Sequence, residues 1–228
     1  MTDEDRRRDV LRRMMESQAY REIMAVNLVG HSLKFVPDAA TKTACIHDLE
    51  EELEHFEAVA SLYEAEGHGD VMDAIQDRLD RVPYPESWLE LAMAQFLYDR
   101  AGGQHLEEYT ECTWEPYAGI VGKILAEEEE HESFGEETLL EMSKSNPDFQ
   151  DAAQPLFEKW LRVGCLSFGR PGTPDSDFAV AEGLKKHDPA EVIQAFIDDI
   201  RPTVAACGLA FPERLEDIGI EAGETVTL

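Results

Sequence analysis

Basic residues are scarce in this sequence. Twenty lysines and arginines stand against 49 aspartates and glutamates, which gives a formal net charge of -29 over 228 residues. Such a surface repels phosphate groups, so we expect no nucleic acid partner and no binding to an anionic membrane face. Lysine is the rarer cation, with only seven residues. This shortage fits adaptation to high salt and an acidic protein from an ordinary medium equally well.

Long hydrophobic runs and paired cysteines are also missing. No stretch approaches the roughly 18 apolar residues of a membrane-spanning helix, and no apolar run follows the arginines of the N-terminus as in a secretory signal. Cys45, Cys112, Cys165 and Cys207 are widely spaced and form no CxxC pair, which excludes the usual zinc and redox motifs. We expect four buried thiols in a cytoplasmic protein that makes no use of a membrane.

Helical periodicity is what the sequence does contain. Apolar residues recur every three or four positions, the spacing of one helix face. We expect long helices over residues 5–35, 38–66, 86–112 and 116–144. A short helix near 71–79 is expected in the long crossover before Pro83 and Pro85, and helices at 155–168 and 189–207 are expected to flank a loop at 169–177. The last sixteen or so residues are expected to be irregular.

Two short connections and one long connection between four long amphipathic helices are typical of a ferritin-like bundle. We therefore predict an all-α fold, a ferritin-like four-helix bundle with additional C-terminal helices. It is expected to form one domain over residues 1–228, with the bundle at about 5–144 and the C-terminal extension at about 150–213.

Two Glu-x-x-His pairs occur on the second and fourth long helices, Glu52 with His55 and Glu128 with His131. Residues at i and i+3 share one helix face, so each pair can offer a carboxylate and an imidazole to the same metal ion. One such pair is weak evidence, because 31 of the acidic residues are glutamates and a chance match on a solvated acidic face is expected.

A second regularity concerns acidic residues that interrupt the apolar stripes of the first and third helices. Glu22 lies thirty residues before Glu52, and Asp99 lies twenty-nine before Glu128. The connection between the first two helices is about 12 residues from Glu22 and about 14 from Glu52, or roughly 18 and 21 Å at 1.5 Å per residue. In the second hairpin, the distances along the two helices from the connection to Asp99 and to Glu128 match in the same way. Four carboxylates and two histidines at one level predict a dinuclear iron or manganese site; the alternative is a purely structural acidic network.

Glu51 and Glu127 precede the two ligand glutamates and are turned about 100° around their helices. Each is a candidate to accept the free N–H of a ligand histidine across the bundle and so to fix its tautomer. A solvated surface glutamate is the alternative for both. The other histidines have no partner at ligand spacing, and we expect none of them to bind metal: His31, His47, His68, His105 and His187.

These residues give the sequence a resemblance to the catalytic subunit family of phenylacetyl-CoA epoxidase, a bacterial di-iron monooxygenase. The resemblance covers about residues 20–213. Its blocks, in chain order, are Arg21-Glu22-Ile23, the Glu-Glu-x-x-His run from Glu51 to His55, Phe96 to Gly102, Pro116-Tyr117-Ala118, the run ending at His131, Phe168-Gly169, Gly208-Leu209 and Phe211-Pro212. The aspartate at position 99 is also similar to this family and unlike ferritins or rubrerythrins.

The resemblance implies six metal ligands that form the catalytic centre: Glu22, Glu52, His55, Asp99, Glu128 and His131. It implies two iron ions (manganese is the alternative), O2, and electrons from a separate NAD(P)H-dependent reductase, used to epoxidise or hydroxylate a small organic substrate in phenylacetate catabolism. An aromatic acyl-CoA thioester is one candidate substrate, and Lys185 and Lys186 are then candidates to contact CoA phosphates, although a solvated lysine pair is the alternative. We expect a homo- or hetero-oligomer. The competing function is a non-catalytic ferritin-like partner subunit.

Overall fold

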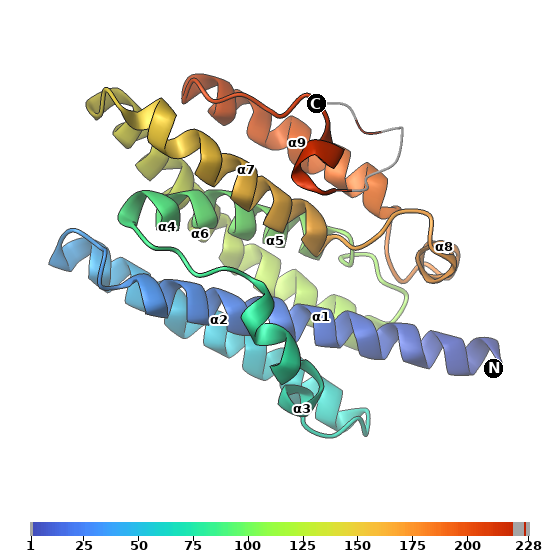
Figure 1. Ribbon diagram of the computed structural model, residues 1–228. Helices are drawn as coiled ribbons and strands as arrows, with labels where there is room; N and C mark the ends of the chain where they lie inside the picture. Colours follow the sequence, from blue (N-terminus) through green and yellow to red (C-terminus); the bar gives the residue numbers. More distant parts are fainter. Residues whose placement is uncertain (1, 221–225, 227–228) are drawn as a thin grey trace.

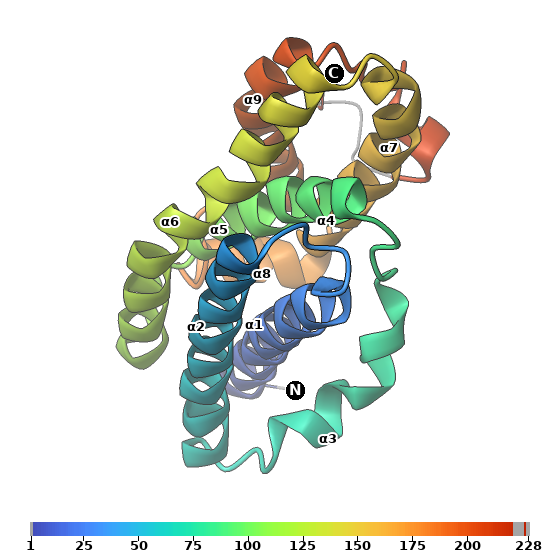
Figure 2. The same cartoon turned by 90° about the vertical axis from the view of Figure 1, so that its left-hand side faces the viewer.

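Every described secondary-structure element of the computed structural model is a helix, which confirms the all-α prediction. The structure describes residues 2–220 and 226, without the side chains of residues 80 and 127–132. Four long antiparallel segments make the bundle: α1 (Asp3–Ser32), α2 (Ala39–Ala65), the composite helix α4–η2–α5, which begins at Trp88 and ends at Glu107, and α6 (Glu115–Ser145). In Figures 1 and 2 the α1–α2 pair lies on one side of α4–η2–α5, and α7 (Phe149–Ser167) and α9 (Pro189–Ala206) lie on the other.

The first hairpin follows the expected signals. Helix α1 ends at Ser32, before Pro37. Asp38 caps α2, because its side chain accepts hydrogen bonds from the backbone N–H groups of Ala40 and Thr41. Gly67, at a φ of +78°, follows the last turn of α2. The end of α1 and the start of α2 fix the register in which the two helices pack.

The third long helix is not a regular α-helix. It consists of α4 (Trp88–Ala94), the π-helical segment η2 (Gln95–Asp99) and α5 (Arg100–Glu107), so it ends five residues before the expected boundary. A π-helical turn contains one more residue than an α-helical turn, and such turns are found mostly at functional sites. Gly135 of α6 packs directly on it, because a Cβ atom at that position would lie 2.9 Å from the Phe96 Cα atom.

The crossover between the two hairpins contains α3 (Val71–Ile75) and the 3-10 helix η1 (Gln76–Arg81), in agreement with the expected short helix. Val71 and Ile75 are buried. Figure 2 shows the chain leaving the end of α2, passing through α3 beside the α1–α2 pair and returning to α4. The crossover therefore places η1 in contact with α1.

The C-terminal helices are α7 (Phe149–Ser167), α8 (Pro174–Ala181) and α9 (Pro189–Ala206), followed by the 3-10 helix η3 (Leu215–Ile218). Three sequence-based boundaries here were wrong. Helix α7 starts six residues before Pro155, α8 occupies part of the predicted loop, and η3 lies within the segment expected to be irregular. Pro174 is in the first turn of α8, where a missing N–H costs nothing, and Thr173 caps it.

Packing joins these helices to the bundle. Trp160, Phe157 and Phe196 are fully buried and belong to the same apolar cluster as Phe96 and Leu97 of η2. All four cysteines are buried free thiols, as predicted. No described helix is long and apolar enough to cross a membrane.

Candidate metal centre

Glu22 on α1 and Glu52 and His55 on α2 converge inside the bundle. One ligand atom from each lies within 4.8 Å of the corresponding atom of the other two, and all three side chains are at most 6% exposed. Glu52 and His55 share a helix face through their i, i+3 spacing. Glu22 lies at their level because it and Glu52 are at similar distances from the connection between α1 and α2. The structure thus brings together three of the six predicted ligand residues.

Gln18 orients Glu22 and was missed by the sequence reasoning. Its side-chain amide nitrogen donates a hydrogen bond to the Glu22 Oε1 atom, and Gln18 is 1% exposed. The two residues are four positions apart on α1, so they are neighbours on one face. This spacing is the signal that would have found Gln18.

Asp99 is the last residue of the π-helical segment and is half-buried. It lines a small cavity of about 20 Å³ together with Glu22 and Glu52. A space of roughly 10–15 Å³ suffices for one water-sized occupant. The third helix therefore contributes its acidic residue to the same interior site as the first hairpin.

The described donor set fits iron or manganese. Carboxylate oxygens and an imidazole nitrogen are donors that suit these metals. Two buried carboxylates side by side are costly without a cation, because burial and like charge both disfavour the ionised form. Glu22, Glu52 and His55 would hold the ion, with Asp99 at the adjoining wall.

Three sequence predictions lie outside the described residues: the ligand roles of Glu128 and His131, and the hydrogen bond of Glu127 to a ligand histidine. Glu51 is half-buried, and its carboxylate lies 3.5 Å from the His47 ring on the same helix. Its predicted contact with the histidine of α6 stays a prediction.

The two candidate phosphate contacts, Lys185 and Lys186, differ in their surroundings. The Lys186 ammonium group lies 2.6 Å from a carboxylate oxygen of Glu107 and thus already has an anionic partner. Lys185 donates a hydrogen bond of 2.8 Å to the Ser176 hydroxyl, and burial lowers its pKa. Lys185 also lines a groove of about 210 Å³ with Arg13 and Arg170. The contact with CoA stays a prediction for Lys185, and the ion pair makes Lys186 the weaker candidate.

Two residues next in sequence to expected ligands line the same 20 Å³ cavity. Arg21 and Tyr98 are each 4% exposed, and the Arg21 guanidinium lies 5.3 Å from the centre of the Tyr98 ring. Burial raises the pKa of the Tyr98 hydroxyl well above its usual value, so this group stays protonated. It is available as a hydrogen-bond donor at the edge of the site.

The family of the chain follows from comparison with known proteins. A family model described as "Phenylacetic acid catabolic protein" matches residues 6–223. The chain belongs to this family. One subunit of 1,2-phenylacetyl-CoA epoxidase from Escherichia coli (strain K12) is 23% identical to it over 219 residues, which cover 92% of this chain and 71% of that relative. The buried Glu22–Glu52–His55 cluster is thus found in a phenylacetic acid catabolic protein, which confirms the resemblance seen in the sequence.

Exchange of Asp99 for asparagine tests its part in the centre. We expect Asp99→Asn to weaken iron binding by about 10- to 100-fold while the thermal unfolding temperature changes little, because a half-buried anion disappears and the apolar core is untouched. Asp151→Asn, an exposed aspartate on α7, is the matched control. Equal iron affinity in both variants would show that Asp99 has no role at the centre.

Proposed function

We propose that this protein is a di-iron oxygenase that uses O2 and externally supplied electrons to epoxidise or hydroxylate an organic substrate. The observation that carries the proposal is the buried cluster of Glu22, Glu52 and His55 in a chain of this family. The proposed ligand set adds Asp99, Glu128 and His131. Iron held by these residues would supply the activation of O2 and the transfer of one oxygen atom.

The protein's own contribution is to hold the ligands and to exclude water. Gln18 fixes one carboxylate through its hydrogen bond. Val59, one turn after His55, is fully buried, and Val121 and Ile124 of α6 are at most 1% exposed. Such an apolar lining protects a reactive oxidant from side reactions with solvent. Electrons are proposed to come from a separate reductase, since the sequence contains no flavin or iron–sulfur motif.

The assembly is proposed to be an oligomer. The relative from Escherichia coli is described as one of the subunits of 1,2-phenylacetyl-CoA epoxidase, which implies further subunits for that enzyme. For this chain we propose a comparable association with a reductase and with copies of itself or a paralogue. Size-exclusion chromatography with light scattering measures this on the purified chain, for self-association, and on its mixture with the reductase or paralogue.

The proposed reaction is tested by isotope incorporation. Iron-loaded protein, an NAD(P)H-dependent reductase and ¹⁸O2 are mixed with phenylacetyl-CoA or with free arylalkanoic acids, and the products are examined by mass spectrometry. We expect one ¹⁸O atom per product and no product from metal-free protein. If reduced, iron-loaded protein labels nothing alone and a paralogous subunit labels product without it, the chain is a non-catalytic partner subunit.

A further inference from the structure

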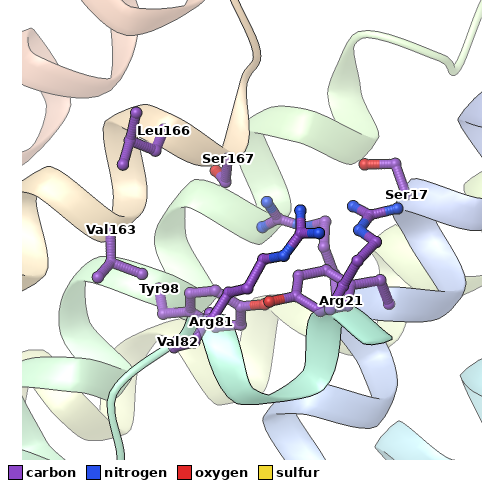
Figure 3. Close-up of a pocket in the computed structure, with 10 residues that line it drawn as sticks. Ser17, Arg21, Arg81, Val82, Tyr98, Val163, Leu166 and Ser167 are labelled. Carbon is purple, nitrogen blue, oxygen red and sulfur yellow. The ribbon is translucent and has the colours of Figure 1, made fainter. Parts of the chain in front are cut away.

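A second cavity, of about 310 Å³, lies beside the metal centre between α1, η1, η2 and α7. Figure 3 shows arginine side chains directed into the space between Ser17 of α1 and the α7 residues Val163, Leu166 and Ser167. The complete lining is Ser17, Tyr20, Arg21, Arg78, Arg81, Val82, Tyr98, Val163, Leu166 and Ser167. Three guanidinium groups in one cavity are unexpected in a chain of charge -29.

Most other arginines of the described chain have acidic partners. Carboxylates pair with Arg6, Arg12, Arg13, Arg100, Arg201 and Arg214. Within the part of the chain that the structure describes, no ion pair involves Arg21, Arg78 or Arg81. None of the three guanidinium groups is therefore held in an ion pair with a described carboxylate, although Arg21 shares the 20 Å³ cavity with Glu22, Glu52 and Asp99.

Arg21 has the greatest need of a hydrogen-bond acceptor among the three arginines, because it is only 4% exposed. Its Nε and Nη1 atoms have no hydrogen-bond partner among the described residues, and neither has the Tyr98 hydroxyl. Leaving a buried charged donor without an acceptor is costly. An oxyanion in the cavity supplies acceptors for these donors at once, and a guanidinium fork matches the two oxygens of a carboxylate.

The opposite wall is apolar. Val82, Val163 and Leu166 line it, and Leu166 is 49% exposed at the surface of α7. A cavity with cations on one side and aliphatic side chains on the other suits a ligand with an anionic head and an apolar body.

The location of the cations decides between a free acid and a thioester. Arg21 and Tyr98 line this cavity and also the 20 Å³ cavity at Glu22, Glu52 and Asp99. A ligand anion bound by Arg21 therefore lies next to the metal centre, together with the carbon atoms that adjoin it. The acyl end of a CoA thioester carries no charge there, whereas a free acid carries its carboxylate.

We propose that this cavity binds the carboxylate of a small organic acid, and that this acid is the substrate of the adjacent centre. The assignment as substrate rests on the proposed function, whereas the binding itself does not. Arg21 and the Tyr98 hydroxyl hold the carboxylate from the inner side, Arg78 and Arg81 hold it from the crossover, and the apolar wall contacts the body of the acid.

Calorimetric titration under argon, with iron-loaded but unreduced protein, tests the binding without turnover. The probes are benzoate, phenylacetate, 3-phenylpropanoate and hexanoate, with phenylacetamide as the neutral analogue of phenylacetate. We expect at least one acid to bind and phenylacetamide to bind at least tenfold more weakly than phenylacetate, because charge-assisted hydrogen bonds are lost. Free CoA and inorganic phosphate are titrated in parallel.

The double variant Arg78→Gln/Arg81→Gln is expected to weaken acid binding at least tenfold, and Arg21→Gln further. Arg162→Gln, an exposed arginine of α7 outside the cavity, is the matched control and should change affinity less than twofold. Circular dichroism shows whether each variant is folded. If Arg21→Gln does not fold, the double variant still tests the site, because Arg78 and Arg81 belong to η1 at the surface and their exchange is expected to leave the fold intact.

The outcomes separate the two proposals. The carboxylate site is overturned if no acid binds, if phenylacetate and phenylacetamide bind equally, or if CoA or phosphate binds more tightly than every acid in an Arg78- and Arg81-dependent way. Oxidation of a thioester without acid binding overturns this inference and leaves the oxygenase intact. Arginine-dependent acid binding without any oxidation overturns the oxygenase and leaves the site.

Discussion

His55→Ala is expected to reduce bound iron from about two atoms per chain to one or none and to lower substrate oxidation by at least about 1,000-fold. The imidazole is 1% exposed and lies with Glu22 and Glu52 in one cluster. Its removal takes away the only nitrogen donor of that cluster, and the remaining carboxylates repel each other without a fully bound cation. Iron is measured by atomic absorption after anaerobic loading and gel filtration, and oxidation by the ¹⁸O assay.

The control for this experiment is on the same helix. His47→Ala removes an imidazole that is exposed on α2 and eight positions from His55, so it is expected to leave iron content and oxidation unchanged. His55→Ala also creates a small cavity beside Val59, and a loss of about 1–3 kcal/mol in the free energy of unfolding is expected from that alone. Full iron content in folded His55→Ala protein would mean that the buried cluster is a structural acidic network.

Much of the fold and half of the candidate site could be predicted because they depend on spacing along single helices. The period of apolar residues sets the long helices, Pro37 and Asp38 set the first turn, and the equal legs of the hairpin bring Glu22 to the level of Glu52 and His55. A local rule of about 1.5 Å per residue is sufficient for such a placement.

Other features could not be predicted because they depend on contacts between distant segments. The π-helical segment that ends at Asp99 has no separate sequence period, and it is packed against Gly135 from another helix. Helix α8 was missed for a local reason: Pro174, within the loop predicted at 169–177, occupies the first turn of a helix that Thr173 caps.

The 310 Å³ cavity with three arginines could not be predicted from the sequence either, because it also depends on contacts between distant segments. Arg21, Arg78 and Arg81 come from two elements more than fifty residues apart, so no basic run marks them in the sequence. Composition excluded a large basic surface, which the structure does not contradict. It could not exclude a small buried group of cations, because three charges hardly change a total of -29.

Gly135→Ala is expected to destabilise the fold by about 1–3 kcal/mol or more, since overpacking costs this much and the clash is with backbone. The added Cβ atom would lie 2.9 Å from both the Gln95 carbonyl carbon and the Phe96 Cα atom, and backbone cannot turn aside as a flexible side chain does. Helix α6 would have to move away from η2, which carries Asp99. Chemical unfolding in urea gives the free energy of unfolding.

Gly122→Ala on the same helix is the matched control. Nothing lies within 4 Å of a Cβ atom at that position, and the glycine is exposed. Alanine is favoured over glycine inside a helix by about 0.8–1.0 kcal/mol, so this variant is expected to gain stability by up to that amount. If the two variants change the free energy of unfolding in opposite directions, the loss at Gly135 comes from the contact with η2, because helix propensity favours alanine at both positions. If Gly135→Ala also gains stability, α6 does not pack on the π segment closely enough to position Asp99, and the third helix loses its assigned place at the metal centre.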